Sequence, residues 1–145
     1  MITITQLKEV STETLQDINQ LLPQLRTDSS EHRGSLSDLR EIVGNTENII
    51  TLVAKDDSRI VGMAALYVIV KVGQRIGHID EVIVDAKYRG QGLGEKLVAG
   101  LIAAARSKKV TELFLTSRSE RVAAIKLYQK LGFTPKDTSV FRLKL

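Results

Sequence analysis

Apolar residues alternate with polar ones in some stretches of the chain and recur at helical spacing in others. Alternation or a short apolar run predicts a strand, whereas apolar residues three and four positions apart predict a helix. The expected strands cover residues 2–7, 49–55, 60–70, 75–84, 111–116 and 138–143. The expected helices follow Ser11, start at Ser35 and at Gly92, and end with one over 121–131. The order β-α-α-β-β-β-α-β-α-β predicts one α/β or α+β domain over residues 1–145, built around a mixed sheet.

Turn and capping residues mark the boundaries between these elements. Asp56, Asp57 and Ser58 separate two expected strands, which predicts a hairpin. Ser117 and Glu120 have the spacing of a capping box just before the last helix. Gly132 follows that helix and predicts its end.

The composition limits which classes of protein and which kinds of binding site are possible. Without cysteine, disulfides and thiolate metal sites cannot form, and with only His32 and His78 we expect no metal centre. The net charge is +4, Lys and Arg are scattered, and only three Phe and three Tyr are present, so we expect no nucleic-acid binding. The apolar runs are too short to span a bilayer and the first residues lack a secretory leader. We therefore expect a cytoplasmic protein without membrane association.

The most specific pattern lies in residues 82–94. They read Val-Ile-Val-Asp-Ala-Lys-Tyr-Arg-Gly-Gln-Gly-Leu-Gly, an apolar strand followed by a turn with alternating glycines before a helix. Glycines let the backbone turn tightly with its N–H groups toward one point, and the helix adds the positive end of its dipole. We expect an anion site there that suits a diphosphate. It is no Walker loop, because Gly94 is followed by Glu95 and Lys96, and the glycine spacing also differs from the dinucleotide fingerprint.

Two acidic residues, Asp80 and Glu81, interrupt the apolar strand that precedes this loop. Neighbours on a regular strand point to opposite faces, so both cannot face the core. A carboxylate buried there needs a partner or a raised pKa. A solvent-facing position or a salt bridge to Arg75 or a lysine is the ordinary alternative for each, and His78 is better explained as a strand residue than as a base.

Arg89, Gly92 and Gly94 make the loop resemble the Arg/Gln-x-x-Gly-x-Gly/Ala loop of the GNAT (GCN5-related) N-acetyltransferases. Residues 121–133 are similar to that family's Asn-x-x-Ala-x-x-Leu-Tyr-x-x-x-Gly-Phe, with Arg121 in place of the asparagine. The resemblance implies the GNAT acyl-CoA N-acyltransferase fold, a mixed sheet of six to seven strands flanked by about four helices. In that fold the sheet opens beside the strand before the glycine loop, and acetyl-CoA enters the gap. The alternative is a glycine-rich turn without a ligand.

The resemblance also implies roles for individual residues. Acetyl-CoA, the implied cosubstrate, contacts the strand end, the loop and the last helix in such proteins, which here are Val82, Ile83, Val84, Arg89, Gly90, Gln91, Gly92, Leu93, Gly94, Glu95, Arg121 and Tyr128. Glu81, or in second place Asp80, is the implied general base for the amine, directly or through water. Tyr128 is the implied proton donor to the leaving thiolate, with ordinary packing as its alternative. Arg121 or Arg118 is expected to reach the phosphates, and no metal is implied.

The implied reaction is acetyl transfer to a primary amine, of a small molecule or a peptide, by direct attack in a ternary complex. Residues 77–81 are similar to the matching stretch of glucosamine-6-phosphate acetyltransferases, which keeps that substrate as an alternative. A non-catalytic CoA-binding module is another alternative. Asp28 and Glu31, in the loop 26–34, are expected to attract a cationic acceptor. Dimers are common in the family, so a homodimer stays open.

Overall fold

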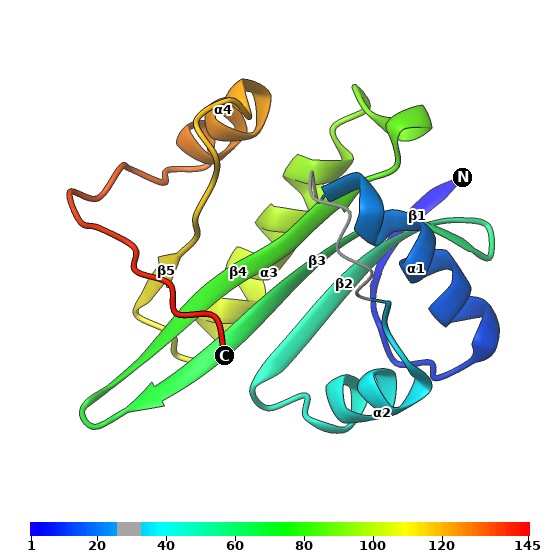
Figure 1. Ribbon diagram of the computed structural model, residues 1–145, viewed down its shortest axis with the longest axis horizontal. Coiled ribbons are helices and arrows are strands. Elements are labelled where there is room, and N and C mark those ends of the chain that lie inside the picture. The colour runs from blue at the N-terminus through cyan, green and yellow to red at the C-terminus, as the bar shows by residue number, and fades with distance from the viewer. Residues whose placement is uncertain (26–32) are drawn as a thin grey trace.

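The computed structural model describes residues 1–25 and 33–145. These residues form a mixed sheet flanked by helices (Figure 1). Over those residues the sheet has five strands in the order β1-β2-β3-β4-β5. The strands are β1 (Ile2–Gln6), β2 (Ile49–Asp56), β3 (Arg59–Lys71), β4 (Gln74–Val84) and β5 (Glu112–Phe114). The first four pair antiparallel with their neighbours, and β5 runs parallel to β4. The predicted mixed sheet and the β2–β3 hairpin are both confirmed.

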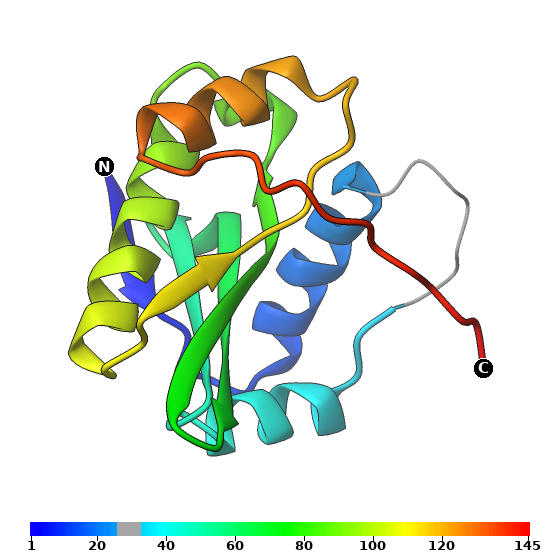
Figure 2. The same ribbon diagram turned by 90° about the vertical axis from the view of Figure 1, so that its left-hand side faces the viewer.

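Helices cover both faces of this sheet (Figure 2). They are α1 (Thr12–Leu25), α2 (Leu36–Gly44), α3 (Leu93–Ser107) and α4 (Val122–Lys130). α1 and α2 pack on one face, and α3 packs on the other. The predicted starts of α1 and α2 are confirmed. The Ser11 hydroxyl accepts the Thr14 N–H at 3.1 Å, and Ser35 forms a capping box with Asp38.

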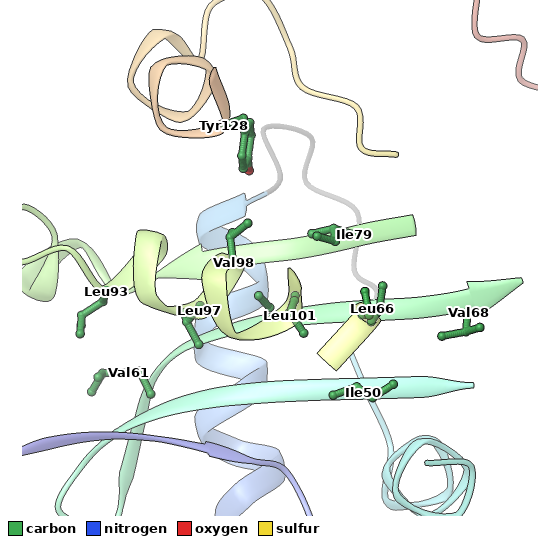
Figure 3. Close-up of a cluster of buried hydrophobic side chains, with 13 residues drawn as sticks. Ile50, Val61, Leu66, Val68, Ile79, Leu93, Leu97, Val98, Leu101 and Tyr128 are labelled. Atoms are coloured by element: carbon green, nitrogen blue, oxygen red, sulfur yellow. The ribbon is translucent and has the colours of Figure 1, made fainter. Parts of the chain in front are cut away.

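The larger buried cluster lies between the sheet and α3 (Figure 3). Leu97, Val98 and Leu101 recur at helical spacing on α3, and all three are completely buried. They pack into the same cluster as Val61 and Leu66 of β3. This packing fixes the N-terminus of α3 close to the carboxyl end of β4, where the glycine loop joins the two elements.

The predicted sheet of six to seven strands is wrong, because the described chain has five. The expected strand over 138–143 belongs to no sheet, and its Phe141 and Leu143 are 92% and 84% exposed. β5 is also shorter than the predicted 111–116. A strand must satisfy its backbone groups on a neighbour, and the apolar pattern of a segment does not reveal whether the chain supplies one.

The predicted capping box before α4 is wrong as well. Arg121 is the N-cap residue of α4, and no side chain caps the helix there. Residues 119–120 form a turn that delays the start of the helix, and the Ser117 hydroxyl donates to the Arg118 carbonyl at 3.4 Å instead. The predicted end of the helix is confirmed, because Gly132 follows it with a φ of 99°.

Candidate active site

Strands β4 and β5 separate beyond a short stretch of pairing. They pair only at Ile76–Glu112, Gly77–Leu113 and His78–Phe114, whereas β4 continues to Val84 along β3. A cavity of about 610 Å³ lies where they part, between the end of β4, the glycine loop, the start of α3 and one side of α4. Beyond residue 78, the edge of β4 that faces β5 is not paired with it, so backbone groups at the end of β4 are open to this cavity.

A β-bulge lies in β4 beside the cavity. Ala65 pairs with Asp80 and Met63 with Ile83, so Glu81 and Val82 together face a single residue of β3. Glu81 has a φ of 55°, which is unusual for a residue with a side chain, and its N–H donates to the Asp80 carboxylate at 2.7 Å. The bulge interrupts the regular alternation expected for this strand, but the prediction that Asp80 and Glu81 do not both face the core is confirmed, because Asp80 is exposed and Glu81 is only half-buried.

The bulge changes which side chains of β4 pack on each face of the sheet. Val82 and Val84 pack with the α3 cluster, while Ile83 between them belongs to the cluster under α1. Ile79 also belongs to the α3 cluster, so the spacing of that face changes across the bulge. Asp80 is exposed and Glu81 is half-buried, which leaves both carboxylates within reach of a polar ligand.

Tyr67 of β3 is a neighbour of these carboxylates that sequence reasoning missed. It pairs with His78 of β4 and is half-buried. Burial, together with the negative charges of Glu81 and Asp80, raises the pKa of Tyr67 to about 12. Tyr67 lies in an apolar run typical of a core strand, and only the register of β3 on β4 brings its hydroxyl to the acidic pair.

The glycine loop leaves its backbone donors open. Gly90 and Gly92 have φ values of 79° and 77°, and Gly92 caps α3 without any side-chain hydrogen bond. The Lys96 N–H donates to the Gly92 carbonyl at 3.1 Å, so the N–H groups of residues 93–95 precede the helical hydrogen-bond ladder. A Cβ placed on Gly90 or Gly92 would meet no atom within 4 Å. Open N–H groups at a helix N-terminus suit an anion such as a diphosphate.

Contacts on the far side of the loop hold its shape. The buried carboxylate of Asp85 accepts the Lys87 N–H at 3.0 Å and lies 3.8 Å from the Arg59 guanidinium. The Tyr88 hydroxyl donates to the Asp56 carboxylate at 2.8 Å. Arg89 donates from Nε to the Val84 carbonyl at 3.0 Å, so its side chain ties the loop back to β4.

Tyr128 of α4 closes the cavity from above the sheet. Its side chain is 6% exposed and meets the ring of Phe133 edge to face, with 6.0 Å between centroids. Its hydroxyl end points from α4 toward the sheet (Figure 3). Burial raises the pKa of Tyr128, the positive charge of Arg121 lowers it, and the negative charge of Asp80 raises it. With burial the largest of these, the hydroxyl is protonated at neutral pH and can donate a proton.

Most of the residues predicted for cofactor binding meet in this one cavity. Its lining includes Val82, Ile83, Val84, Arg89, Gly90, Gly92, Leu93, Gly94, Glu95, Arg121 and Tyr128. Gln91 is exposed on the loop outside that lining, and Asp80 and Glu81 lie beyond its edge at the bulge. The Glu95 carboxylate is 3.0 Å from Lys130 Nζ, which ties α3 to α4. Asp28 and Glu31 lie outside the described residues.

One lining residue gave no signal in the sequence. Gln24, in the last turn of α1, accepts the Ala86 N–H on its side-chain oxygen at 3.0 Å. It lines the cavity together with Leu25, so the end of α1 forms part of the cavity wall. A polar glutamine near the end of a helix is common, and only the packing of α1 against β4 gives it this position.

Within the part of the chain that the structure describes, no three His, Asp or Glu residues come together as a metal-binding group. Over residues 1–25 and 33–145, no helix is long and apolar enough to cross a membrane.

The comparisons with known proteins all indicate the same family. A family model described as the acetyltransferase (GNAT) family matches residues 13–133. A glucosamine 6-phosphate N-acetyltransferase of Trypanosoma brucei brucei is 38% identical over 104 residues, which are 68% of this chain and 66% of that protein. Glucosamine 6-phosphate N-acetyltransferase 1 of rice, Oryza sativa subsp. japonica, is 28% identical over 93% of this chain and 81% of its own length.

Solved structures give the same result for the fold. An acetyltransferase of Trypanosoma brucei superposes with a TM-score of 0.79 at 30% identity, and the match covers 100% of each chain. A glucosamine-6-phosphate N-acetyltransferase of Arabidopsis thaliana has a TM-score of 0.81 at 22% identity, over 99% of this chain and 98% of its own. The chain therefore belongs to the GNAT family of acetyltransferases, which use acetyl-CoA as the acetyl donor.

Proposed function

We propose that this chain transfers the acetyl group of acetyl-CoA directly to the primary amine of an amino sugar phosphate, with glucosamine 6-phosphate as the acceptor. One observation supports the reaction above all: the glycine loop and Tyr128 line the same cavity, at the point where β4 parts from β5. Binding of CoA needs a site for its diphosphate, and acetyl transfer from its thioester needs a proton donor for the leaving thiolate.

The residues around the cavity fit the donor. The N–H groups of residues 93–95 and the positive-φ glycines of the loop suit the diphosphate, and Arg121 on the same cavity adds a positive charge. β5 pairs with β4 only at residues 76–78, so the backbone of residues 82–84 suits pairing with the amides of the pantetheine arm. A backbone N–H there also suits stabilisation of the thioester oxygen.

The chemistry then needs a base and an acid on opposite sides of the reacting carbon. Glu81 or Asp80 takes a proton from the ammonium group, which frees the nitrogen lone pair for attack on the thioester carbonyl. As the C–S bond breaks, Tyr128 donates its hydroxyl proton to the sulfur. The chain contains no cysteine, which fits direct attack without a thiol acyl-enzyme.

The choice of acceptor rests on the relatives. Two relatives that align over more than two thirds of this chain are named glucosamine 6-phosphate N-acetyltransferases. N-alpha-acetyltransferase 30 of Xenopus laevis aligns over only 49% of this chain, which makes a peptide amine the second candidate.

The test of the acceptor is thiol release from acetyl-CoA with glucosamine 6-phosphate, glucosamine and a short peptide. We expect the highest kcat/KM with glucosamine 6-phosphate, and a lower value with glucosamine, which has the same amine without the phosphate. Turnover with the peptide alone would favour the second candidate. Tight CoA binding without turnover on any amine would favour a non-catalytic module.

A pair of glycine substitutions tests the diphosphate site. Gly92 and Gly73 both have positive φ values, 77° and 87°, and a Cβ on either would meet no atom within 4 Å. Gly92→Ala and Gly73→Ala should each lose about 1–2 kcal/mol of stability, because alanine is strained in this conformation. Only Gly92→Ala should raise the KM for acetyl-CoA, by about 10-fold, or about 1.4 kcal/mol of binding. Equal KM values in the two variants would place the diphosphate elsewhere.

A further inference from the structure

We propose that Tyr67 determines the specificity for the acceptor. Its hydroxyl binds an oxygen on a carbon next to the reacting amine, while Asp80 and Glu81 bind the amine itself. The acceptor class is then an amino alcohol with the two groups on neighbouring carbons, as in a 2-amino sugar. Tyr67 acts in the amine acetylation proposed above, on which this inference rests.

Tyr67 lies on the same face of the sheet as Asp80. Met63 pairs with Ile83, and both side chains belong to the cluster under α1. Ala65 and Tyr67 follow Met63 at intervals of two residues, so their side chains point to that face as well. Ala65 pairs with Asp80, which places Tyr67 diagonally across from Asp80 on the neighbouring strand. A side chain as long as tyrosine reaches such a diagonal neighbour.

Within the described residues, α1 and α2 cover this part of the sheet only in part. Met63 and Ile83 are 4% and 3% exposed under α1, whereas Tyr67 is half-buried and Asp80 is exposed. His78, which pairs with Tyr67, is half-buried too. A ligand on this face can therefore contact Tyr67 and Asp80 together.

The Tyr67 hydroxyl is a donor that the described chain leaves unused. Over residues 1–25 and 33–145 it makes no hydrogen bond, whereas the Tyr88 hydroxyl donates to Asp56 at 2.8 Å. Burial and the negative charges of Glu81 and Asp80 raise the pKa of Tyr67 to about 12, so the hydroxyl is protonated at neutral pH. A half-buried donor without a partner is unfavourable, and an oxygen of a ligand would satisfy it.

These groups suit an amine with an oxygen beside it. The carboxylates of Asp80 and Glu81 attract an ammonium group, and the Tyr67 hydroxyl donates to an oxygen on the neighbouring carbon. In a 2-amino sugar, the carbons on both sides of the amine carbon carry hydroxyl groups. A lysine side chain has only a methylene group next to its amine, so it offers no such oxygen.

The position of the amine also fits the donor cavity. Val82 lines that cavity and follows Asp80 by two residues along β4. An amine bound at Asp80 therefore lies just beyond the edge of the cavity, beside the bulge. Tyr67 lies on β3, away from the loop and from α4, so its substitution should leave the donor site intact.

The test measures kcat/KM of the wild type and of Tyr67→Phe with three acceptors: glucosamine 6-phosphate and its 1-deoxy and 3-deoxy analogues. With glucosamine 6-phosphate, Tyr67→Phe should lower kcat/KM about 10-fold, through the loss of one hydrogen bond. The KM for acetyl-CoA and the melting temperature should not change. In the wild type, one deoxy analogue should show the same loss, and in Tyr67→Phe that analogue should lose nothing further.

Ile69→Ala is the matched control, because Ile69 follows Tyr67 by two residues on the same face of β3 and is 44% exposed. It should leave the ratios of kcat/KM among the three acceptors unchanged. If Tyr67→Phe lowers kcat/KM equally for all three acceptors, or for none, the inference is overturned and the proposed acetyl transfer stands. A wild type that acetylates none of the three would overturn the proposed acceptor, and the role of Tyr67 in binding it with it.

Discussion

Tyr128→Phe should lower kcat by about 10²–10⁴-fold, the usual range for the loss of a general acid or base. The substitution removes one oxygen and keeps the ring, whose edge contact with Phe133 at 6.0 Å holds it in place. The dissociation constant of CoA and the melting temperature should therefore change little. Lys126→Ala is the control on the same helix, because Lys126 is exposed and does not line the cavity.

The pH profile of the wild type gives a second check on the same residue. The protonated hydroxyl is the active form, and burial raises its pKa above the ordinary value of 10.0. On the alkaline side kcat should therefore hold to a higher pH than an ordinary tyrosine would allow, and then fall as the hydroxyl loses its proton. A Tyr128→Phe variant with wild-type kcat, folded and bound to CoA, would remove the acid role from this residue.

Asp80→Asn with Glu81→Gln should lower kcat/KM for the amine at pH 7 by about 10²-fold or more, through the loss of the general base. Asparagine keeps an oxygen that can accept the Glu81 N–H, which the Asp80 carboxylate accepts at 2.7 Å, so the bulge should persist. The variant should recover activity as the pH rises, because the amine then loses its proton to water. The two proteins are compared over the pH range in which kcat/KM of the wild type does not change.

The two single variants identify which carboxylate is the base. The residue whose single substitution reproduces the pH dependence of the double variant is the base, and the other carboxylate is a positioning residue. If the double variant keeps the wild-type rate at pH 7, neither carboxylate takes the proton.

The parts of the site that depend on local sequence were predictable. The positive-φ glycines at the start of α3 and the burial of Tyr128 follow from residue types and spacing along one element. The bulge at Glu81 was not predictable, because it depends on the register between β3 and β4. The same holds for Tyr67 and Gln24, which reach the site through the pairing of β3 and the packing of α1.

The predicted number of strands was wrong for a related reason. Residues 138–143 have a strand pattern, but pairing is a property of two segments, and the described sheet ends at β5. The large apolar side chains of that segment remain exposed in the described chain.

The most direct test of the donor site is a titration of isotope-labelled protein with CoA, followed through the backbone amide signals. If the donor binds between β4, the glycine loop and α4, the largest shifts should fall on residues 82–84 and 89–95, with little change at the Gly73 turn. Large shifts along 110–117 with none at 89–95 would contradict this placement of acetyl-CoA, and with it the reaction assigned to Tyr128.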